Sequence, residues 1–176
     1  SFNLLIAQKE SEISQMKSSL PNLLSQISQI TPMAPNTKVL YYRGQKGIQQ
    51  LLWNTLKAKG EQVGLGYTDW NDAVGKSFAE ELRNEYVARG ICLREVLNEK
   101  TSDYTVNNAY LTKYFRARYI PKKIITIKHD TYIYNNVFAY LHYYNNEYFG
   151  VEIHNQEIAD TEKQIFEILW KMAKLL

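Results

Sequence analysis

The chain has 176 residues, of which 45% are hydrophobic and 13% aromatic, so it can bury a sizeable core and is not disordered over most of its length. Its net charge of +3 is too small to predict nucleic-acid binding by itself. The single cysteine, Cys92, excludes an intrachain disulfide and a cysteine-based metal site. Because no apolar run is long enough for a membrane span and the opening residues lack the pattern of a signal peptide, we expect a cytoplasmic protein without membrane partners.

The apolar positions of residues 1–30 follow a heptad pattern. A narrow apolar seam with polar flanks favours pairing with a second helix, and we therefore predict a dimerisation helix and a homodimer. The alternative is a helix that lies on its own domain. The seam consists of Ile6, Ile13, Met16, Leu20, Leu23, Ile27 and Ile30. Residues 31–37, which contain two of the four prolines, are predicted to form a linker.

Strands and helices alternate from residue 38 to residue 97. The apolar runs at 39–42, 62–68 and 91–97 predict three strands. A helix is predicted between the first two strands, ending at Gly60, and another from Thr68 or Asp69 to Gly90. Because each pair of strands is separated by a helix, we expect parallel pairing through right-handed crossovers and an α/β fold.

The last third of the chain predicts a helix, a hairpin and a terminal helix. Residues 104–115 have a helical stripe, and Asn135-Asn136 predicts the turn of a hairpin between two apolar runs. A strand over 148–153 then leads into an amphipathic helix, which we expect to cover the sheet. The face of this helix that is predicted to be apolar consists of Ile158, Thr161, Ile165, Ile168, Leu169 and Met172, with Phe166 and Trp170 beside it.

Several segments together resemble a known family. GVEIHNQEIADTEKQIFEILWKMA resembles the end of the phospholipase-D-like half-domain of TrmB-type transcription regulators, and YYRGQKGIQQLLWNTL, LREVLNE and RARYIP resemble its earlier parts. The resemblance implies a phospholipase-D-like effector domain over 38–176, a mixed sheet flanked by helices, with a coiled-coil helix over 1–30 before it. It also implies a winged-helix DNA-binding domain, which we expect to be absent from these residues, so DNA would be bound only through that domain.

Catalysis of the phospholipase D type needs a nucleophilic histidine with a lysine two positions later and an aspartate downstream. None of His129, His142 and His154 is followed by such a lysine. We therefore expect no catalytic residues and no enzyme activity. The histidines are scattered, and the glycines at 64 and 66 lack the lysine of a phosphate loop, so we also expect no metal site and no cofactor.

The ends of the predicted strands suggest a binding site instead, since ligands of open α/β sheets lie beyond the carboxyl ends of parallel strands. The candidate ligand-binding residues are Arg43, Thr68, Asp69, Trp70, Arg94, Glu95, Arg116 and Arg118. Aromatic faces with arginine, aspartate and threonine are typical of sites for a sugar or for a phosphorylated or carboxylated metabolite.

Two alternatives stay open for these residues. The arginines could belong to a structural ion-pair network, and Arg118 is the strongest candidate for such an anchor. Basic residues interleaved with aromatic ones could also bind a single-stranded nucleic acid; they are Lys113, Arg116, Arg118, Lys122, Lys123 and Lys128. We expect the effector and dimerisation part of a transcription regulator, with a purely structural dimerisation or protein-interaction module as the alternative.

Overall fold

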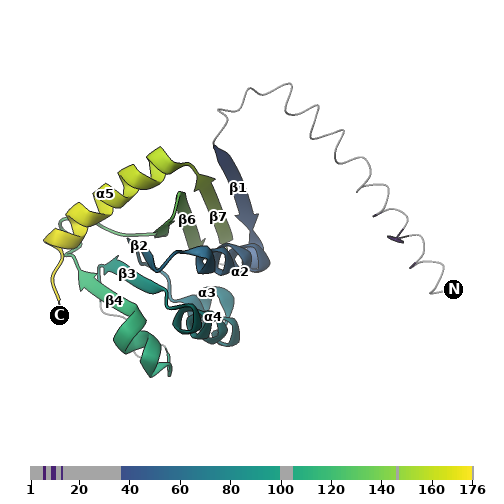
Figure 1. Cartoon of the computed structure of the whole chain (residues 1–176), viewed down its shortest axis with the longest axis horizontal. Helices are drawn as coiled ribbons and strands as arrows, with labels where there is room; N and C mark the ends of the chain where they lie inside the picture. The colour runs from purple at the N-terminus through teal and green to yellow at the C-terminus, as the bar shows by residue number, and fades with distance from the viewer. Residues whose placement is uncertain are drawn as a thin grey trace. The chain divides into compact units, whose positions relative to one another are not determined.

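The computed structural model describes residues 6, 9, 10, 13, 37–99, 105–145 and 147–175 (Figure 1). Lys38–Leu176 forms a compact unit of its own. Most of the predicted dimer seam lies outside the described residues; its members Ile6 and Ile13 are exposed. Within the part of the chain that is described, no helix combines the length and the apolar character needed to cross a bilayer.

The described residues form one mixed sheet of seven strands. In the order of the sheet, the strands are β1 (Lys38–Arg43), β7 (Glu147–His154), β6 (Val137–Tyr144), β5 (Asp130–Tyr134), β2 (Glu61–Leu65), β3 (Cys92–Leu97) and β4 (Phe115–Tyr119). β2, β3 and β4 are parallel to one another, and every other neighbouring pair is antiparallel. The predicted α/β class with a mixed sheet and flanking helices is therefore confirmed.

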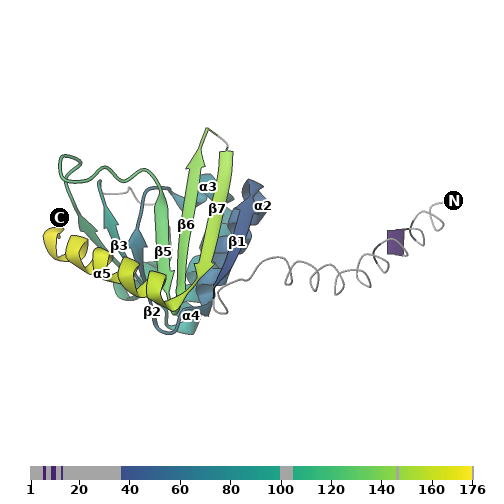
Figure 2. The ribbon, with the colours of Figure 1, turned by 90° about the horizontal axis from the view of Figure 1, so that it is seen from above.

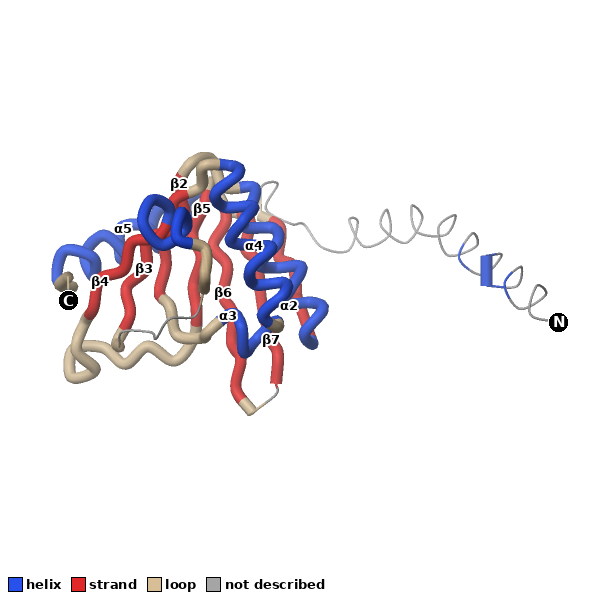
Figure 3. The backbone as a smooth tube through the Cα atoms, turned by 90° about the horizontal axis from the view of Figure 1, so that it is seen from below, coloured by secondary structure: helices blue, strands red, loops and turns tan. Residues whose placement is uncertain are grey.

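Helices cover both faces of this sheet. On one face lie α2 (Gly44–Asn54), which continues in the 3-10 turn Thr55–Lys57, α3 (Trp70–Val74), α4 (Lys76–Arg89) and the π-helical turn Tyr110–Tyr114. On the other face lies α5 (Gln156–Met172), which runs across the strands (Figure 2). Figure 3 shows α2, α3 and α4 together in front of the sheet and α5 behind it. Each face has its own apolar core, so the sheet is the shared wall of two layers.

Several local predictions hold for simple physical reasons. The β5–β6 hairpin turns at Asn135, whose φ is 49°, a left-handed conformation that asparagine tolerates. The side chain of Asn155 caps α5 by accepting a hydrogen bond from the Ile158 amide at 3.0 Å. Gly90 ends α4 with a φ of 66°, as a glycine after a helix commonly does.

Three predictions of secondary structure and pairing were wrong. The helix expected between Asp69 and Gly90 is broken at Gly75, whose φ of 86° starts a new helix, α4, in another direction. β1 does not pair in parallel with β2; it lies at the edge of the sheet, antiparallel to β7. Residues 115–119 form the strand β4, so the helix predicted over 104–115 is reduced to the turn Tyr110–Tyr114.

The face of α5 that contacts the sheet also differs from the prediction. Ala159 and Phe166 are the helix residues buried against the sheet, with Leu169 and Trp170 beside them. Of the predicted apolar face, Leu169 packs against the buried cluster, whereas four other members point away from the sheet and are exposed: Ile158 by 36%, Ile165 by 47%, Ile168 by 59% and Met172 by 49%. Periodicity could not choose between the two faces, because both are apolar.

Candidate ligand pocket

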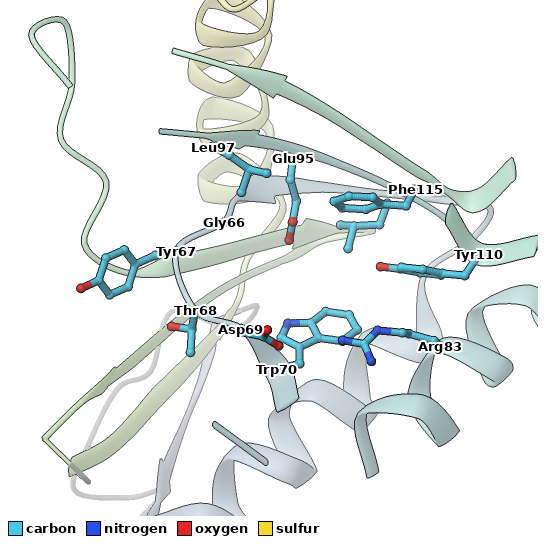
Figure 4. A pocket seen from close by; sticks show the side chains of 11 residues that line it. Gly66, Tyr67, Thr68, Asp69, Trp70, Arg83, Glu95, Leu97, Tyr110 and Phe115 are labelled. Atoms are coloured by element: carbon cyan, nitrogen blue, oxygen red, sulfur yellow. The ribbon is translucent and has the colours of Figure 1, made fainter. Parts of the chain in front are cut away.

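A pocket lies where the parallel strands β2 and β3 end, between the sheet and the helices α3 and α4 (Figure 4). Its empty volume, including the mouth, is about 430 Å³. This is the place at which ligands of α/β sheets bind. The pocket is lined by Gly66, Tyr67, Thr68, Asp69, Trp70, Arg83, Leu93, Glu95, Leu97, Tyr110 and Phe115.

Two glycines of β2 and the loop after it allow the chain to pass close to its neighbours. A Cβ on Gly64 would lie 1.7 Å from the backbone oxygen of Thr131 on β5, so only glycine permits this contact. A Cβ on Gly66 would lie 2.4 Å from Leu97 and 2.9 Å from the carboxylate of Glu95. The two glycines therefore serve close packing beside the pocket.

Glu95 supplies the buried acid of the pocket. It lies on β3, is only 7% exposed, and points toward the space that the hydroxyl of Tyr110 also faces (Figure 4). Burial raises the pKa of Glu95 to about 8; the negative charge of Asp130 adds to the rise and the positive charge of Arg83 opposes it. At neutral pH most Glu95 side chains are therefore protonated, and the carboxyl group can both donate and accept a hydrogen bond.

Arg83 and Trp70 form a fixed wall of the pocket. The guanidinium of Arg83 donates to Asn71 Oδ1 at 3.0 Å and to Glu80 Oε1 at 2.7 Å, and it lies over the indole of Trp70 at 5.7 Å. The indole N–H of Trp70 donates to the hydroxyl of Tyr132 at 2.9 Å. These contacts hold both side chains in place before any ligand binds.

Asp130 fixes the loop at the mouth of the pocket. It is the first residue of β5, and its Oδ1 accepts hydrogen bonds from the amides of Tyr67 at 3.0 Å and Thr68 at 3.1 Å. Burial raises the pKa of Asp130 to about 6, although these hydrogen bonds lower it. The next turn begins at Asp69, whose Oδ1 accepts from the Asn71 amide at 2.7 Å and caps α3.

The structure brings together four of the eight predicted ligand-binding residues. Thr68, Asp69, Trp70 and Glu95 line the pocket. The other four lie outside this pocket. Arg43 is exposed at the end of the edge strand β1. Arg94, Arg116 and Arg118 lie together in a second, open pocket on the α5 side of the sheet, beside Trp170.

Arg94 and Arg118 anchor α5. Arg94 forms ion pairs with Glu61 at 2.8 Å and with Glu167 of α5 at 2.6 Å. Arg118 donates to the backbone oxygen of Trp170 at 2.9 Å and lies over its ring at 4.7 Å. Because Arg94 and Glu95 are neighbours on one strand, their side chains point to opposite faces, so they could not line the same pocket.

Sequence reasoning missed Arg83, Tyr110 and Asp130. Arg83 carried a usable signal, because it lies on the apolar face of α4 together with Ala79, Leu82 and Tyr86, where an arginine needs a buried partner. Asp130 carried a similar signal as an acid at the start of a fully buried strand. Tyr110 had none, since the chain contains 14 tyrosines.

Two of the three histidines, His129 and His142, lie close to each other. The rings of His129 and Tyr140 are 4.4 Å apart, and burial together with the nearby His142 lowers the pKa of His129. Among the described residues, no group of three or more histidines, cysteines and acids could hold a metal ion.

Neither a family model nor a curated protein matches this chain. Three solved structures are similar in fold. TrmBL2, an archaeal chromatin protein whose structure shows a novel mode of DNA binding, matches 96% of this chain and 66% of its own at 15% identity, with a TM-score of 0.54. NucT from Helicobacter pylori matches 80% of this chain and 99% of its own at 11% identity, with a TM-score of 0.60. Phosphatidylserine synthase of Haemophilus influenzae Rd KW20 matches 72% of this chain and 35% of its own at 8% identity, with a TM-score of 0.50.

These similarities concern the fold, because the identities are low. The chain spans just under two thirds of the length of TrmBL2 and about one third of the synthase. The prediction that the chain is not an enzyme does not stand, since the same fold occurs in enzymes such as phosphatidylserine synthase and is therefore compatible with catalysis. The comparisons therefore show a fold shared with TrmBL2, NucT and the synthase.

Proposed function

We propose that this chain is the effector and dimerisation part of a TrmB-like transcription regulator, built on a phospholipase-D-like half-domain over 38–176. We further propose that its pocket binds a small, neutral, polyhydroxylated metabolite such as a sugar. The similarity to TrmBL2 over 96% of the chain supports the regulatory role. The proposal of a sugar-like ligand rests on one observation: the buried acid Glu95 lies between aromatic side chains at the ends of two parallel strands.

The charges of the pocket favour a neutral ligand over an anionic one. The positive charge of Arg83 is already balanced by Glu80 at 2.7 Å. Glu95 and Asp130 add negative charge as the pH rises, because both are acids buried beside the pocket. At neutral pH an anionic metabolite would therefore meet the negative charge of Asp130 and, among the residues that line the pocket, no cation without an acidic partner.

The aromatic and polar groups match the chemistry of a sugar. Trp70 and Phe115 line the pocket with aromatic carbon atoms that the apolar side of a pyranose can contact, while Glu95 and the hydroxyls of Thr68 and Tyr110 offer hydrogen bonds to its hydroxyl groups. A protonated carboxyl is suited to such a ligand because it both donates and accepts.

Ligand binding must be coupled to DNA binding for the domain to regulate. The ligand has to bind two arrangements of the dimer with different affinity, since equal affinity would shift nothing. We place the dimer contact in the heptad seam of residues 1–30, the connection in the linker 31–37, and DNA binding in a winged-helix domain outside these residues. Sedimentation of the full chain carrying Leu23→Glu tests the seam, because a charge in it should reduce the dimer.

Thermal unfolding with a panel of compounds tests the ligand class. Each neutral sugar is paired with its phosphorylated form, and the wild type is compared with Glu95→Ala and with Arg116→Ala, a control at a predicted residue outside the pocket. A specific sugar at 100 times its Kd should stabilise the wild type by about 2.7 kcal/mol, or several degrees in Tm. The shift should disappear in Glu95→Ala and persist in Arg116→Ala.

Two outcomes would contradict this proposal. Stabilisation by the phosphorylated forms alone would show that the charge argument is wrong. A flat response to the whole panel would favour the alternative, a structural dimerisation or protein-interaction module that binds no ligand.

A further inference from the structure

α5 has a second apolar face that the described part of Lys38–Leu176 leaves open. Phe166 and Ala159 point to the sheet, whereas Ile158, Ile165 and Ile168 point away from it and are exposed. Figure 2 shows the helix lying across the sheet with its outer side uncovered by any other described element. Monomeric proteins rarely expose a continuous apolar stripe of this kind, and such a stripe marks a contact surface.

The spacing of the open stripe is that of a helix–helix seam. Its members are Ile158, Thr161, Ile165, Ile168 and Met172, separated by 3, 4, 3 and 4 residues. This is the spacing at which one helix packs its side chains between those of another. The outer face of α5 is therefore shaped for a helix rather than for a flat surface or a small ligand.

The charges beside the seam identify the occupant. Glu157 and Asp160 are exposed near the start of α5, and Lys171 is exposed in its last turn. Two of the charged residues at the middle of the helix are used within the chain: Lys163 lies 3.9 Å from Glu61, and Glu167 pairs with Arg94. Neither Glu157 nor Lys171 forms an ion pair with another described residue, so the two ends of the helix present opposite charges outward.

We propose that the occupant is α5 of a second copy of this chain, packed in the antiparallel direction. The two-fold axis passes near Ile165, so that Ile158 faces Met172 of the partner subunit, and the reverse. Glu157 and Asp160 then lie beside Lys171 of the partner subunit at both ends of the contact. The two helix dipoles also oppose one another in this arrangement, whereas a parallel pair would place like charges and like dipole ends together.

The heptad segment at the start of the chain fits this surface less well. Residues 18–30 contain no charged residue, and Pro21 interrupts any helix that they form. Residues 18–30 therefore offer nothing to the charged ends of α5, although their apolar seam has the same spacing; the charged residues of the segment, Lys9, Glu10, Glu12 and Lys17, all precede them. The α5 contact is thus separate from the contact proposed for residues 1–30, and it does not depend on a ligand.

Disulfide trapping tests the contact and its direction in the full chain. Cys92→Ser provides the background, and single cysteines replace Ile158 or Met172. In an antiparallel pair, oxidation should link the Ile158→Cys chain to the Met172→Cys chain in a mixture. Neither variant should link efficiently to itself, because the same position on the two helices is then about 20 Å apart (14 residues at about 1.5 Å each).

Three results of this experiment would overturn the proposal: no linked dimer in the mixture, self-linking of each variant without mixed linking, or linking of Ile158→Cys to a chain that carries Ile13→Cys. The first result would mean no contact, the second a parallel pair, and the third occupation of the surface by the segment at the start of the chain. Circular dichroism of each variant confirms that it is folded.

A charge swap gives an independent measurement. In a Leu23→Glu background, in which the seam of residues 1–30 is weakened, Glu157→Lys and Lys171→Glu should each weaken self-association roughly tenfold at low salt, because each change turns two attractive pairs per dimer into repulsive ones. Mixing the two variants should restore the affinity, since the mixed pair has opposite charges at both ends. Val106→Lys, a change at an exposed apolar position away from α5, should leave self-association unchanged. Sedimentation velocity over a range of concentrations reads the association, and no restoration on mixing would refute the antiparallel pairing.

Discussion

Replacing Glu95 by glutamine should make the protein more stable at alkaline pH. Glutamine has nearly the same shape and can form hydrogen bonds, but it cannot ionise. The pKa of Glu95 is about 8 in the folded protein, against an ordinary value of 4.5. Between these two values the folded state keeps a proton that the unfolded state has released, so the free energy of unfolding falls as the pH rises through this window.

The pKa difference sets the size of the effect. It is 8 − 4.5 = 3.5 units, and at about 1.36 kcal/mol per unit the ionisable group costs at most about 5 kcal/mol above pH 8. We expect Glu95→Gln to match the wild type within about 1 kcal/mol near pH 5 and to exceed it by a few kcal/mol at pH 8.5. Asp130 titrates in both proteins, so the difference between them isolates Glu95.

Urea unfolding followed by tryptophan fluorescence at several pH values measures this difference. Glu81→Gln, on the exposed side of α4, is the matched control for the loss of one carboxylate outside the pocket. If Glu95→Gln is instead less stable than the wild type at pH 8.5, then the carboxylate is charged in the folded protein and is stabilised by Arg83. The argument for a neutral acid in the pocket would then fail.

Two further predictions concern the scaffold around the pocket. Gly64→Ala should destabilise the protein by roughly 3 kcal/mol or more, because the new Cβ would clash with the Thr131 backbone oxygen. Gly66→Ala should cost less, because the Leu97 and Glu95 side chains can move to relieve part of the clash. Urea unfolding midpoints of both variants test this order. Arg94→Gln should raise the pKa of Glu167 toward its ordinary value of 4.5, because the hydrogen bond from Arg94 lowers it in the wild type. The stability that Glu167 contributes above pH 4.5, which is lost as the pH falls through its folded pKa, should then vanish, and NMR titration of the Glu167 carboxyl measures the shift.

Local chemistry made much of the fold predictable from the sequence. The strands β2, β3, β6 and β7 and the turn at Asn135 followed from apolar runs and from residues that favour turns. The position of β1 did not, because its pairing with β7 joins residues more than a hundred positions apart and leaves no local pattern. The strand β4 was not predicted. Its sequence, in which Arg116 and Arg118 flank Ala117, has no apolar run, and so it is similar to the sequence of a loop.

The pocket was predictable in its place but not in its full composition. The rule that ligands lie beyond the ends of parallel strands located Thr68, Trp70 and Glu95. The same rule was extended to Arg43, whose strand is not among the parallel ones. Arg83 reaches the pocket from α4, on one face of the sheet. The break at Gly75 sets the direction of α4, and this direction brings Arg83 to the pocket.

The link between α3 and α2 shortens the route from the pocket to the start of the compact unit. Along the sheet, four strand pairings separate β2 from β1. Through the helices the route is much shorter: the side chains of Gln45 and Gln49 donate hydrogen bonds to the backbone oxygens of Ala73 and Val74, and α2 begins at the residue after β1. A displacement of Trp70 and α3 would therefore act on the side chains of Gln45 and Gln49 in α2. Because α2 directly follows β1, the displacement would reach the strand that follows the predicted linker.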